Sequence, residues 1–444
     1  MRSKSFHVAS GGWQPVTFGN MATLKRSAIQ PKDAVGRPYI GLEHIEESGL
    51  RLNGMGEAED VNSTKSCFVS GDILFGKLRP YFRKLVRATF DGICSTDIWV
   101  VQARTGIDQG YLFYLMASDE FVEPIVQRSE GTRMPRAKWG VAEKLTFSIP
   151  PLPEQRRIAH VLGTLDDKIE NNRKMAKTLE AMAQAIFQSW FVDFDPVRAK
   201  MAGGSRESIC KRLKLTPEIL DLFPDRLVES ELGEIPEGWR VEMLNNLAAL
   251  VTDSISPRRS PNTVFEHYSI PAFDAGRTPA MELGESIKSN KYVVKRSAVL
   301  VSKLNPHTPR IWLPAIGEGA ALCSTEFMQF VPREREDRPY LYCLMISQSM
   351  QEEVLKHVTG STGSRQRAQP SQIAKVRILS PQSCVQKAFT QQASPMLHAV
   401  AENLTASRTL AALRDTLLPK LISGEIRVPE FEHFLQSTQG AESC

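Results

Sequence analysis

An internal repeat is the feature that most constrains how this chain folds. Four short words recur in the same order, the first two at a spacing of 226 positions and the last two at 229. The words are Gly12-Trp13 with Gly238-Trp239, Lys77-Leu-Arg-Pro80 with Lys303-Leu-Asn-Pro306, Cys94-Ser-Thr96 with Cys323-Ser-Thr325, and Tyr111-Leu-Phe-Tyr-Leu-Met116 with Tyr340-Leu-Tyr-Cys-Leu-Met345. This period is far too long for a solenoid repeat. The sequence therefore predicts two copies of one domain.

Composition limits the class of protein. The 444 residues are 42% hydrophobic and 24% charged, which is typical of a soluble globular chain of two to four domains. No run of 18 apolar residues occurs and the first residues are polar, so we expect a cytoplasmic protein. Seven scattered cysteines without a CxxC pair indicate neither a disulfide framework nor a structural zinc site. A net charge of +5 permits a polyanion partner without requiring one.

Each copy divides into a globular part and a long helix. From Trp13 to Pro150, short apolar stretches separated by Gly, Pro and Asn indicate an α+β globule. After Pro153, apolar residues step by four and three, which is the rhythm of a helix with a coiled-coil seam. The expected seam is Ile158, Leu162, Leu165, Ile169, Asn172, Ala176, Leu179, Ala183, Ile186 and Trp190.

The second copy carries the same rhythm, and its expected seam is Phe389, Ala393, Met396, Val400, Asn403, Ser407 and Leu410. Asn172 and Asn403 occupy equivalent seam positions, where a polar residue either fixes the helix register or marks a solvated turn. Two such helices pack most simply as an antiparallel pair.

The expected fold is thus α+β, with two similar globular domains separated by two long antiparallel coiled-coil helices in approximate two-fold symmetry. The expected boundaries are 1–152 for the first globule, 153–198 for its helix, 199–237 for a linker, 238–383 for the second globule, 384–426 for its helix and 427–444 for a tail.

Two basic clusters recur in both copies and are candidates for DNA binding. Basic side chains interleaved with aromatic or turn residues suit a phosphate backbone, and the arginine fork matches guanine or phosphate. A solvated charged face is the alternative for either cluster alone. The first copy supplies Lys77, Arg79, Tyr81, Arg83, Lys84, Arg133, Arg136 and Lys138, and the second supplies Lys303, Asn305, His307, Arg365 and Arg367. We expect Arg136 to contact a base.

Catalytic motifs are weak. Gly71 to Lys77 has the spacing of a phosphate loop, but Leu78 stands where a Mg²⁺-binding hydroxyl is needed. Asp193-Phe-Asp195-Pro196 only loosely matches an amino-methyltransferase motif, and no glycine-rich cofactor loop accompanies it. The eight histidines are dispersed and form no metal-binding or triad pattern. We therefore expect no catalytic residue and no metal site.

Several segments resemble those of specificity subunits of type I restriction-modification systems, and the resemblance extends over nearly the whole chain. The segments are Pro150-Pro-Leu-Pro-Glu-Gln-Arg-Arg-Ile-Ala159, Leu165-Asp-Asp-Lys-Ile-Glu-Asn-Asn172, Phe187-Gln-Ser-Trp-Phe-Val-Asp-Phe194, Leu232-Gly-Glu-Ile-Pro-Glu-Gly-Trp239 and Arg414-Asp-Thr-Leu-Leu-Pro-Lys-Leu-Ile-Ser-Gly-Glu425.

The resemblance implies a non-catalytic reader of an asymmetric, bipartite DNA site. The helices would set the gap between half-sites and dock two methyltransferase subunits, with restriction and translocase subunits joining them. S-adenosylmethionine, ATP and Mg²⁺ would then act on the partner subunits, with none bound by this chain. The chain departs from the resemblance at Leu379 to Val385, which lacks the acid and arginines of its first-copy counterpart.

Two other interpretations stay open from the sequence alone. One is a coiled-coil scaffold or toxin-antitoxin-like assembly protein with no DNA role. The other is an enzyme in which Asp193 to Pro196 is a working methylation motif.

Overall fold

The chain forms two compact units in a computed structural model that describes residues 12–131, 133–317, 319–360 and 366–428. The first unit comprises Met1–Lys168 with Leu410–Cys444, and the second comprises Ile169–Thr409. Two long helices, α5 (Leu152–Phe191) and α14 (Ser383–Ser423), contribute residues to both units. The boundaries expected from the sequence separate the globules from the helices, whereas each unit of the structure includes part of both helices. The expected boundaries therefore stay predictions.

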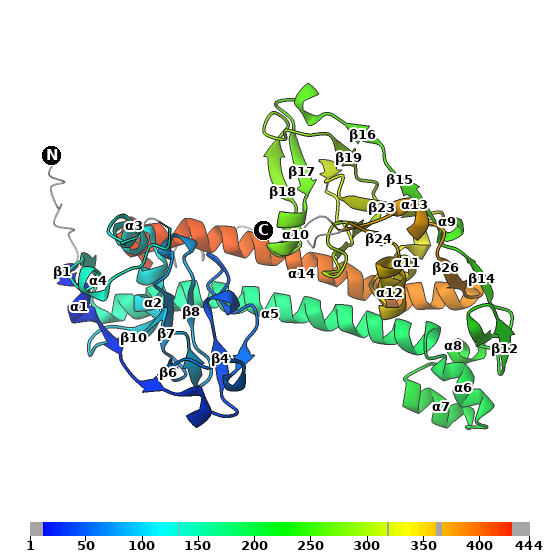
Figure 1. The fold of residues 1–444 in the computed structure, drawn as a ribbon, viewed down its shortest axis with the longest axis horizontal. Helices are drawn as coiled ribbons and strands as arrows, with labels where there is room; N and C mark the ends of the chain where they lie inside the picture. Colours follow the sequence, from blue (N-terminus) through cyan, green and yellow to red (C-terminus); the bar gives the residue numbers. More distant parts are fainter. Residues whose placement is uncertain (1–11, 132, 318, 361–365, 429–444) are drawn as a thin grey trace, which may run out of the picture. The chain divides into compact units, whose positions relative to one another are not determined.

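The first unit contains two main sheets and several short helices (Figure 1). An antiparallel sheet has the order β2 (Ala22–Lys25), β10 (Ile98–Ala103), β7 (Ile73–Gly76) and β8 (Leu85–Arg87). A mixed sheet has the order β3 (Ala28–Ile29), β6 (Lys65–Phe68), β9 (Gly92–Cys94), β4 (Pro38–Ile40) and β5 (Gly56–Glu57), with β4 and β9 parallel. The remaining elements are the pair β1 (Gln14–Thr17) and β11 (Thr146–Ile149), and helices α1 (Phe18–Met21), α2 (Gln109–Ala117), α3 (Asp119–Gln127) and α4 (Trp139–Ala142).

The second unit repeats this topology strand for strand. Its antiparallel sheet has the order β15 (Ala248–Val251), β23 (Phe327–Pro332), β20 (Val299–Ser302) and β21 (Ile311–Trp312). Its mixed sheet has the order β16 (Ser254–Ile255), β19 (Lys291–Val293), β22 (Ala320–Cys323), β17 (Val264–Tyr268) and β18 (Ala280–Leu283). The pair β14 (Arg240–Met243) and β26 (Arg377–Ser380) and the helices α9 (Leu244–Leu247), α11 (Arg338–Ile346), α12 (Gln348–Lys356) and α13 (Pro370–Ile373) complete the match. The second unit also contains α10 (Ile270–Asp274) and the pair β24 (Val358–Thr359) and β25 (Arg367–Ala368), which have no named counterpart among the described elements of the first. The predicted duplication and the α+β class are confirmed.

Within the first unit, α5 and α14 run antiparallel and bury their predicted seam. Ile158 and Leu162 are 1% and 0% exposed and share a core with Leu417 and Leu421 of α14. Polar contacts flank this core, because Arg414 donates to Asp166 over 2.7 Å and the Tyr114 hydroxyl of α2 donates to the same carboxylate over 2.7 Å. Burial, followed by the charge of Asp166, raises the pKa of Tyr114. The hydroxyl therefore stays a donor that ties the globule to the helix pair.

The same two helices also pack antiparallel within the second unit. The rings of Phe187 and Phe389 lie 5.8 Å apart at one end of the unit's helix pair. Further along, the Ser407 hydroxyl donates to the carbonyl of Ile169 over 3.4 Å. Every seam residue predicted on α5 and α14 is buried or half-buried, which confirms the four-three pattern.

The register role of the seam asparagines stays a prediction, and the structure shows one hydrogen bond of Asn403. Its side-chain amide donates to the carbonyl of Ala399, one turn earlier in its own helix, over 2.7 Å. This bond uses one of the two N–H groups of the amide, so it does not decide whether Asn403 also fixes the register of the facing helix. A cross-helix hydrogen bond is made by Ser407, one turn later in the seam.

The segment expected to be a linker contains regular structure. It folds into α6 (Asp195–Met201), α7 (Arg206–Leu213), α8 (Pro217–Asp221) and a hairpin of β12 (Leu227–Ser230) and β13 (Gly233–Pro236). Ser205 and Thr216 cap α7 and α8 by accepting the backbone N–H of the third residue of each helix. Phe223 and Ile235 join the core of the second unit, which fixes the segment in place.

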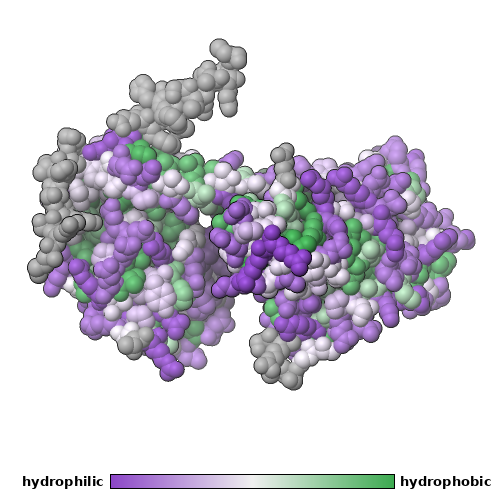
Figure 2. Space-filling model, turned by 90° about the horizontal axis from the view of Figure 1, so that it is seen from above, coloured by the Kyte–Doolittle hydropathy of each residue, from purple (hydrophilic) through white to green (hydrophobic). Residues whose placement is uncertain are grey.

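Polar side chains cover most of the face drawn in Figure 2, with small hydrophobic patches between them. No helix among the described residues is long and apolar enough to span a membrane.

Candidate nucleic-acid interface

Two loops of the first unit carry the basic clusters predicted from the sequence, and the fold joins them. The first basic loop, residues 77–84, follows β7, and the second basic loop, residues 131–138, precedes α4. The Ala137 N–H donates to the Lys77 carbonyl over 2.8 Å, and the Arg79 N–H donates to the Pro135 carbonyl over 2.7 Å. These bonds form a bridge between Leu78 and Arg136. Leu78 and Arg136, which are 58 positions apart in sequence, thus lie side by side on one surface.

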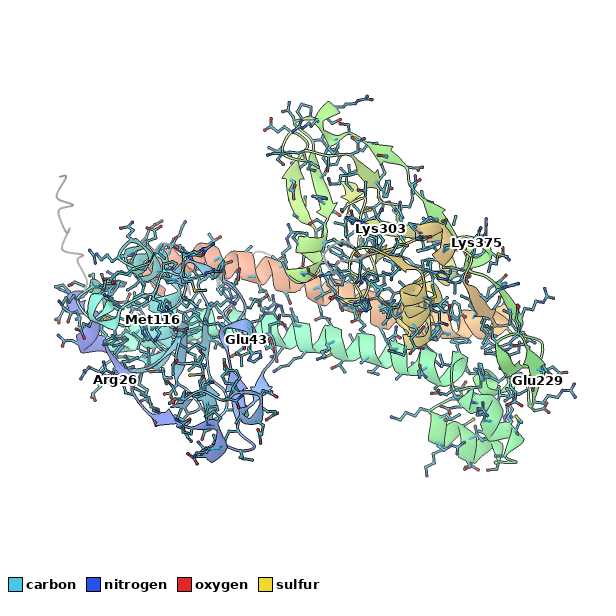
Figure 3. All side chains as sticks on the ribbon, in the orientation of Figure 1. Arg26, Glu43, Met116, Glu229, Lys303 and Lys375 are labelled. Atoms are coloured by element: carbon cyan, nitrogen blue, oxygen red, sulfur yellow. The ribbon has the colours of Figure 1, made fainter. Side chains whose placement is uncertain are left out.

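The second unit builds the same pair of loops with the same bonds. The Ala368 N–H donates to the Lys303 carbonyl over 2.9 Å, and the Asn305 N–H donates to the Gln366 carbonyl over 3.0 Å. A bridge between Leu304 and Arg367 completes the match. Lys303, labelled in Figure 3, marks the start of the first basic loop in this unit.

The geometry shows which arginines of the second basic loop are equivalent in the two units. Matching Gly131 with Gly360 pairs residues 229 apart, and this spacing would place Arg136 opposite Arg365. The bridges instead make Arg136 equivalent to Arg367, 231 positions later. The second basic loop is therefore two residues longer between its glycine and its bridge arginine in the second unit. A shared glycine at the start of the loop does not predict this difference. Arg365 itself lies outside the described residues.

Arg79 and Asn305 are equivalent and adopt the same unusual backbone. Their φ angles are +51° and +48°, in the left-handed region that residues other than glycine rarely enter. Each also keeps a buried polar atom, Arg79 Nε and Asn305 Oδ1, without a hydrogen-bond partner among the described residues. Strain and unsatisfied polar groups of this kind concentrate at functional sites. The backbone frame is thus shared while the side-chain chemistry differs.

A carboxylate meets the arginine of the second basic loop in both units. In the first unit, Arg136 Nε and Nη2 lie 3.3 and 3.5 Å from the two carboxylate oxygens of Asp97, and Lys77 Nζ lies 3.8 Å from one of them. In the second unit, Arg367 Nε and Nη2 contact Glu326 at 3.0 to 3.3 Å. The hydrogen bond with Glu326 raises the pKa of Arg367. Arg367 therefore stays charged at the surface.

The other predicted residues of the first unit fall into two groups. Arg83 pairs with Asp119, Lys138 lies 2.5 Å from Glu130, and Lys84 Nζ donates to the Leu42 carbonyl over 2.8 Å. Tyr81 and Arg133 are exposed, and Arg133 has no ion-pair partner in the described part of the chain. The structure therefore brings these residues onto the two neighbouring basic loops of the first unit. In the second unit, His307 is exposed at the position of Tyr81.

Sequence reasoning missed Asp97 and Glu326, although a signal was present. The repeated word Cys-Ser-Thr is followed by an acidic residue in both copies, and the word was used only to align them. Met134 was also missed: it is 53% exposed between Arg133 and Pro135 on the second basic loop. An exposed nonpolar side chain beside arginines is suited to contact with a base face.

Groups that could support metal or thiol chemistry do not gather here. Among the described residues, no three His, Cys, Asp or Glu side chains are placed to hold a metal ion. Burial raises the pKa of Cys94 and of Cys323 to about 12, so both thiols stay protonated and unreactive near neutral pH. The surface formed by the basic loops is thus one of charge and hydrogen bonding.

Comparison with known proteins gives consistent similarities. Residues 11–181 match the family described as type I restriction modification DNA specificity domain. The specificity subunit of the type I restriction enzyme HindI from Haemophilus influenzae is 26% identical over 411 residues, which cover 82% of this chain and 88% of that protein. The specificity subunit of the type I restriction enzyme MjaIX from Methanocaldococcus jannaschii is 26% identical over 340 residues, covering 74% of this chain and 71% of that protein.

One solved structure supports the architecture. The S subunit of a type I restriction-modification system from M. genitalium aligns with a TM-score of 0.57 at 14% identity, over 93% of this chain and 96% of that one. At this identity, the likeness concerns the fold alone.

Proposed function

We propose that the chain is a specificity subunit of a type I restriction-modification system and that its two units each read one half of a bipartite DNA sequence through their paired basic loops. The observation that carries this proposal is that the two basic loops are joined in the same way in both units, an arrangement called the loop frame below. Both units join the two loops by the same backbone hydrogen bonds, and both place an arginine at the bridge, Arg136 in one and Arg367 in the other. Arginine forks suit bidentate contact with guanine.

The two half-sites differ in this proposal. Direct readout depends on which donors and acceptors a side chain presents to the base edges. Arg79 and Tyr81 of the first unit are replaced by Asn305 and His307 at equivalent positions of the second. Asparagine is suited to adenine, whereas arginine is suited to guanine. A shared frame with different side chains therefore favours an asymmetric target.

Catalysis lies with other chains in this proposal. The relatives are named as subunits of restriction enzymes, which supports an assembly with partner subunits. We assign to them the modification chemistry, by two methyltransferase subunits that bind S-adenosylmethionine, and the restriction chemistry, by subunits that use ATP and Mg²⁺. Exposed faces of α5 and α14 would dock the methyltransferase subunits. A double-stranded DNA target also favours a cytoplasmic location.

The test is duplex binding by the chain purified with its methyltransferase partner. Sequencing of methylated adenines in host DNA, with and without the gene, defines the candidate target. The complex should bind that duplex more tightly than a scrambled one, and its affinity should fall steeply as salt rises, because phosphate contacts release counterions.

The matched variant replaces Arg133, Arg136, Arg365 and Arg367 together by alanine. It should assemble with the partner yet lose the preference for the target. Equal binding of all duplexes by the unmodified complex, or full preference in the variant, would favour a scaffold role instead.

A further inference from the structure

The acidic residue that follows the repeated Cys-Ser-Thr word is held in the same way in both units. The Ser95 hydroxyl accepts the Asp97 N–H over 3.2 Å, and the Ser324 hydroxyl accepts the Glu326 N–H over 3.2 Å. The carbonyls of Asp97 and Glu326 in turn accept the N–H groups of Lys77 and Lys303, each over 2.9 Å. The acid is therefore fixed to the start of the first basic loop by its own backbone.

Its side chain reaches the arginine of the second basic loop in both units. Asp97 faces Arg136 and Glu326 faces Arg367, each through the Nε edge of the guanidinium. Aspartate and glutamate differ in length by one methylene, yet the contact is made in both units. Since most other side chains on these loops differ between the copies, the retained contact is a shared feature of the frame.

A carboxylate at a DNA-binding surface has two physical effects. It repels phosphate, so it opposes binding to the backbone of any duplex, whatever the sequence. It also restricts the long arginine side chain by a charge-assisted hydrogen bond to the Nε edge. In Arg136, which is 52% exposed, this leaves the edge formed by the two Nη groups as the one suited to guanine O6 and N7.

We propose that Asp97 and Glu326 are specificity-determining positioning residues, each of which orients one arginine toward a base and disfavours its use on phosphate. This proposal rests on the proposed function of the loops. Each acid acts through its arginine and serves the half-site that its own unit reads.

The test uses the complex of the full chain with its methyltransferase partner and four duplexes: the mapped target, one with each half-site scrambled, and one with both scrambled. Asp97→Asn and Glu326→Gln keep the side-chain size and remove the charge. Each variant should lower the preference for one intact half-site by about fivefold or more, and the two should affect different halves. Binding to the fully scrambled duplex should be unchanged or tighter.

Matched controls remove a carboxylate from an arginine pair elsewhere in each unit. Glu46→Gln removes the partner of Arg51 in the first unit, and Glu237→Gln removes the partner of Arg226 in the second. Both controls should keep the wild-type preference at both half-sites, which separates positioning from a general change of charge.

The outcomes distinguish this proposal from the one on which it rests. If the unmodified complex does not discriminate the mapped target, the proposed function is wrong. If it discriminates and Asp97→Asn and Glu326→Gln retain full preference at both halves, or lose it equally at both, the positioning role is wrong. Thermal unfolding of each variant shows whether the chain is folded, and a folded variant with a lost half-site preference supports the proposal.

Discussion

At the scale of single residues, Arg136 and Arg133 lie three positions apart on one loop but have different surroundings. Arg136 is held by Asp97, whereas Arg133 is exposed without an ion-pair partner among the described residues. A restrained fork favours a defined base, and a mobile charge favours phosphate.

We therefore expect Arg136→Ala to cost about 1–3 kcal/mol of binding to the target and to relax preference at one base position. Arg133→Ala should weaken all duplexes alike and reduce the salt dependence by about one phosphate contact. Binding to a set of single-base variants of the target, at several salt concentrations, measures both effects. The assignment fails if Arg136→Ala weakens every duplex equally.

His267 of β17 predicts a pH dependence of stability. Burial lowers its pKa below the usual value, against the opposing effect of a hydrogen bond to the Glu282 carboxylate, and its Nε2 atom is buried without a partner among the described residues. The folded chain therefore favours the neutral ring, while the unfolded chain takes up a proton below about pH 6.5. The histidine's contribution to stability is present above that pH and is lost as pH falls further.

Urea unfolding at about pH 7.5 and about pH 5.5 checks this expectation. His267→Gln should lose less stability between the two pH values than the unmodified chain. Tyr39 occupies the equivalent position in the first unit, as the pairing of β4 with β9 and of β17 with β22 shows, so the effect belongs to the second unit. An identical loss in both proteins would show that His267 does not titrate in this range.

At the scale of elements, the helix seam was predictable and the register contact was not. Apolar side chains at four-three spacing bury themselves wherever a second helix offers the same stripe, so Ile158, Leu162 and Phe389 could be identified from spacing alone. A polar seam residue has several hydrogen-bond partners within reach, including its own helix, and Asn403 uses one of these. The sequence therefore predicts which face of each helix packs against the other, but it does not predict which polar groups bond within that face.

The seam also sets an expected stability change. Leu162 is 0% exposed in the core of the first unit, whereas Leu413, on α14 of the same unit, is 43% exposed. Leu162→Ala should lower the free energy of unfolding by about 2–5 kcal/mol, because it removes buried surface and leaves a cavity. Leu413→Ala should change it by less than about 0.5 kcal/mol. Chemical denaturation of the purified chain compares the two, and similar losses would mean that the seam is not packed as described.

The helices between α5 and the second globule were missed for a different reason. Residues 199–237 are rich in charged and turn-forming residues, which is typical of a linker, and α7 is only eight residues long. Such short helices depend on capping and on packing against the rest of the unit, as Phe223 does in the core. Local composition does not reveal those contacts.

At the scale of the whole molecule, each unit has its own core. The sheets of the first unit pack with Leu162, Leu417 and Leu421, and those of the second pack with Phe187, Phe389 and Leu397. Both helices are therefore used twice, once in each core. Repeated words in the sequence predict this duplication. The spacing between equivalent residues grows from 226 to 229 and then to 231 at Arg136 and Arg367, because the loops differ in length. Equivalent side chains in the loops are therefore identified by matching backbone hydrogen bonds and not by sequence spacing.

Separate cores predict that the two half-sites can be exchanged one at a time. A chimera that replaces residues 12–150 by the matching segment of a related specificity subunit changes the basic loops of the first unit and keeps α5, α14 and the second unit. Because Lys303 to His307 and Arg367 are untouched, one half of the methylated sequence should change to that of the donor and the other half should persist. Sequencing of methylated adenines in cells that carry the chimera with the original methyltransferase reads both halves at once. A change in both halves would mean that the units do not read DNA independently, whereas a change in neither would place recognition outside residues 12–150.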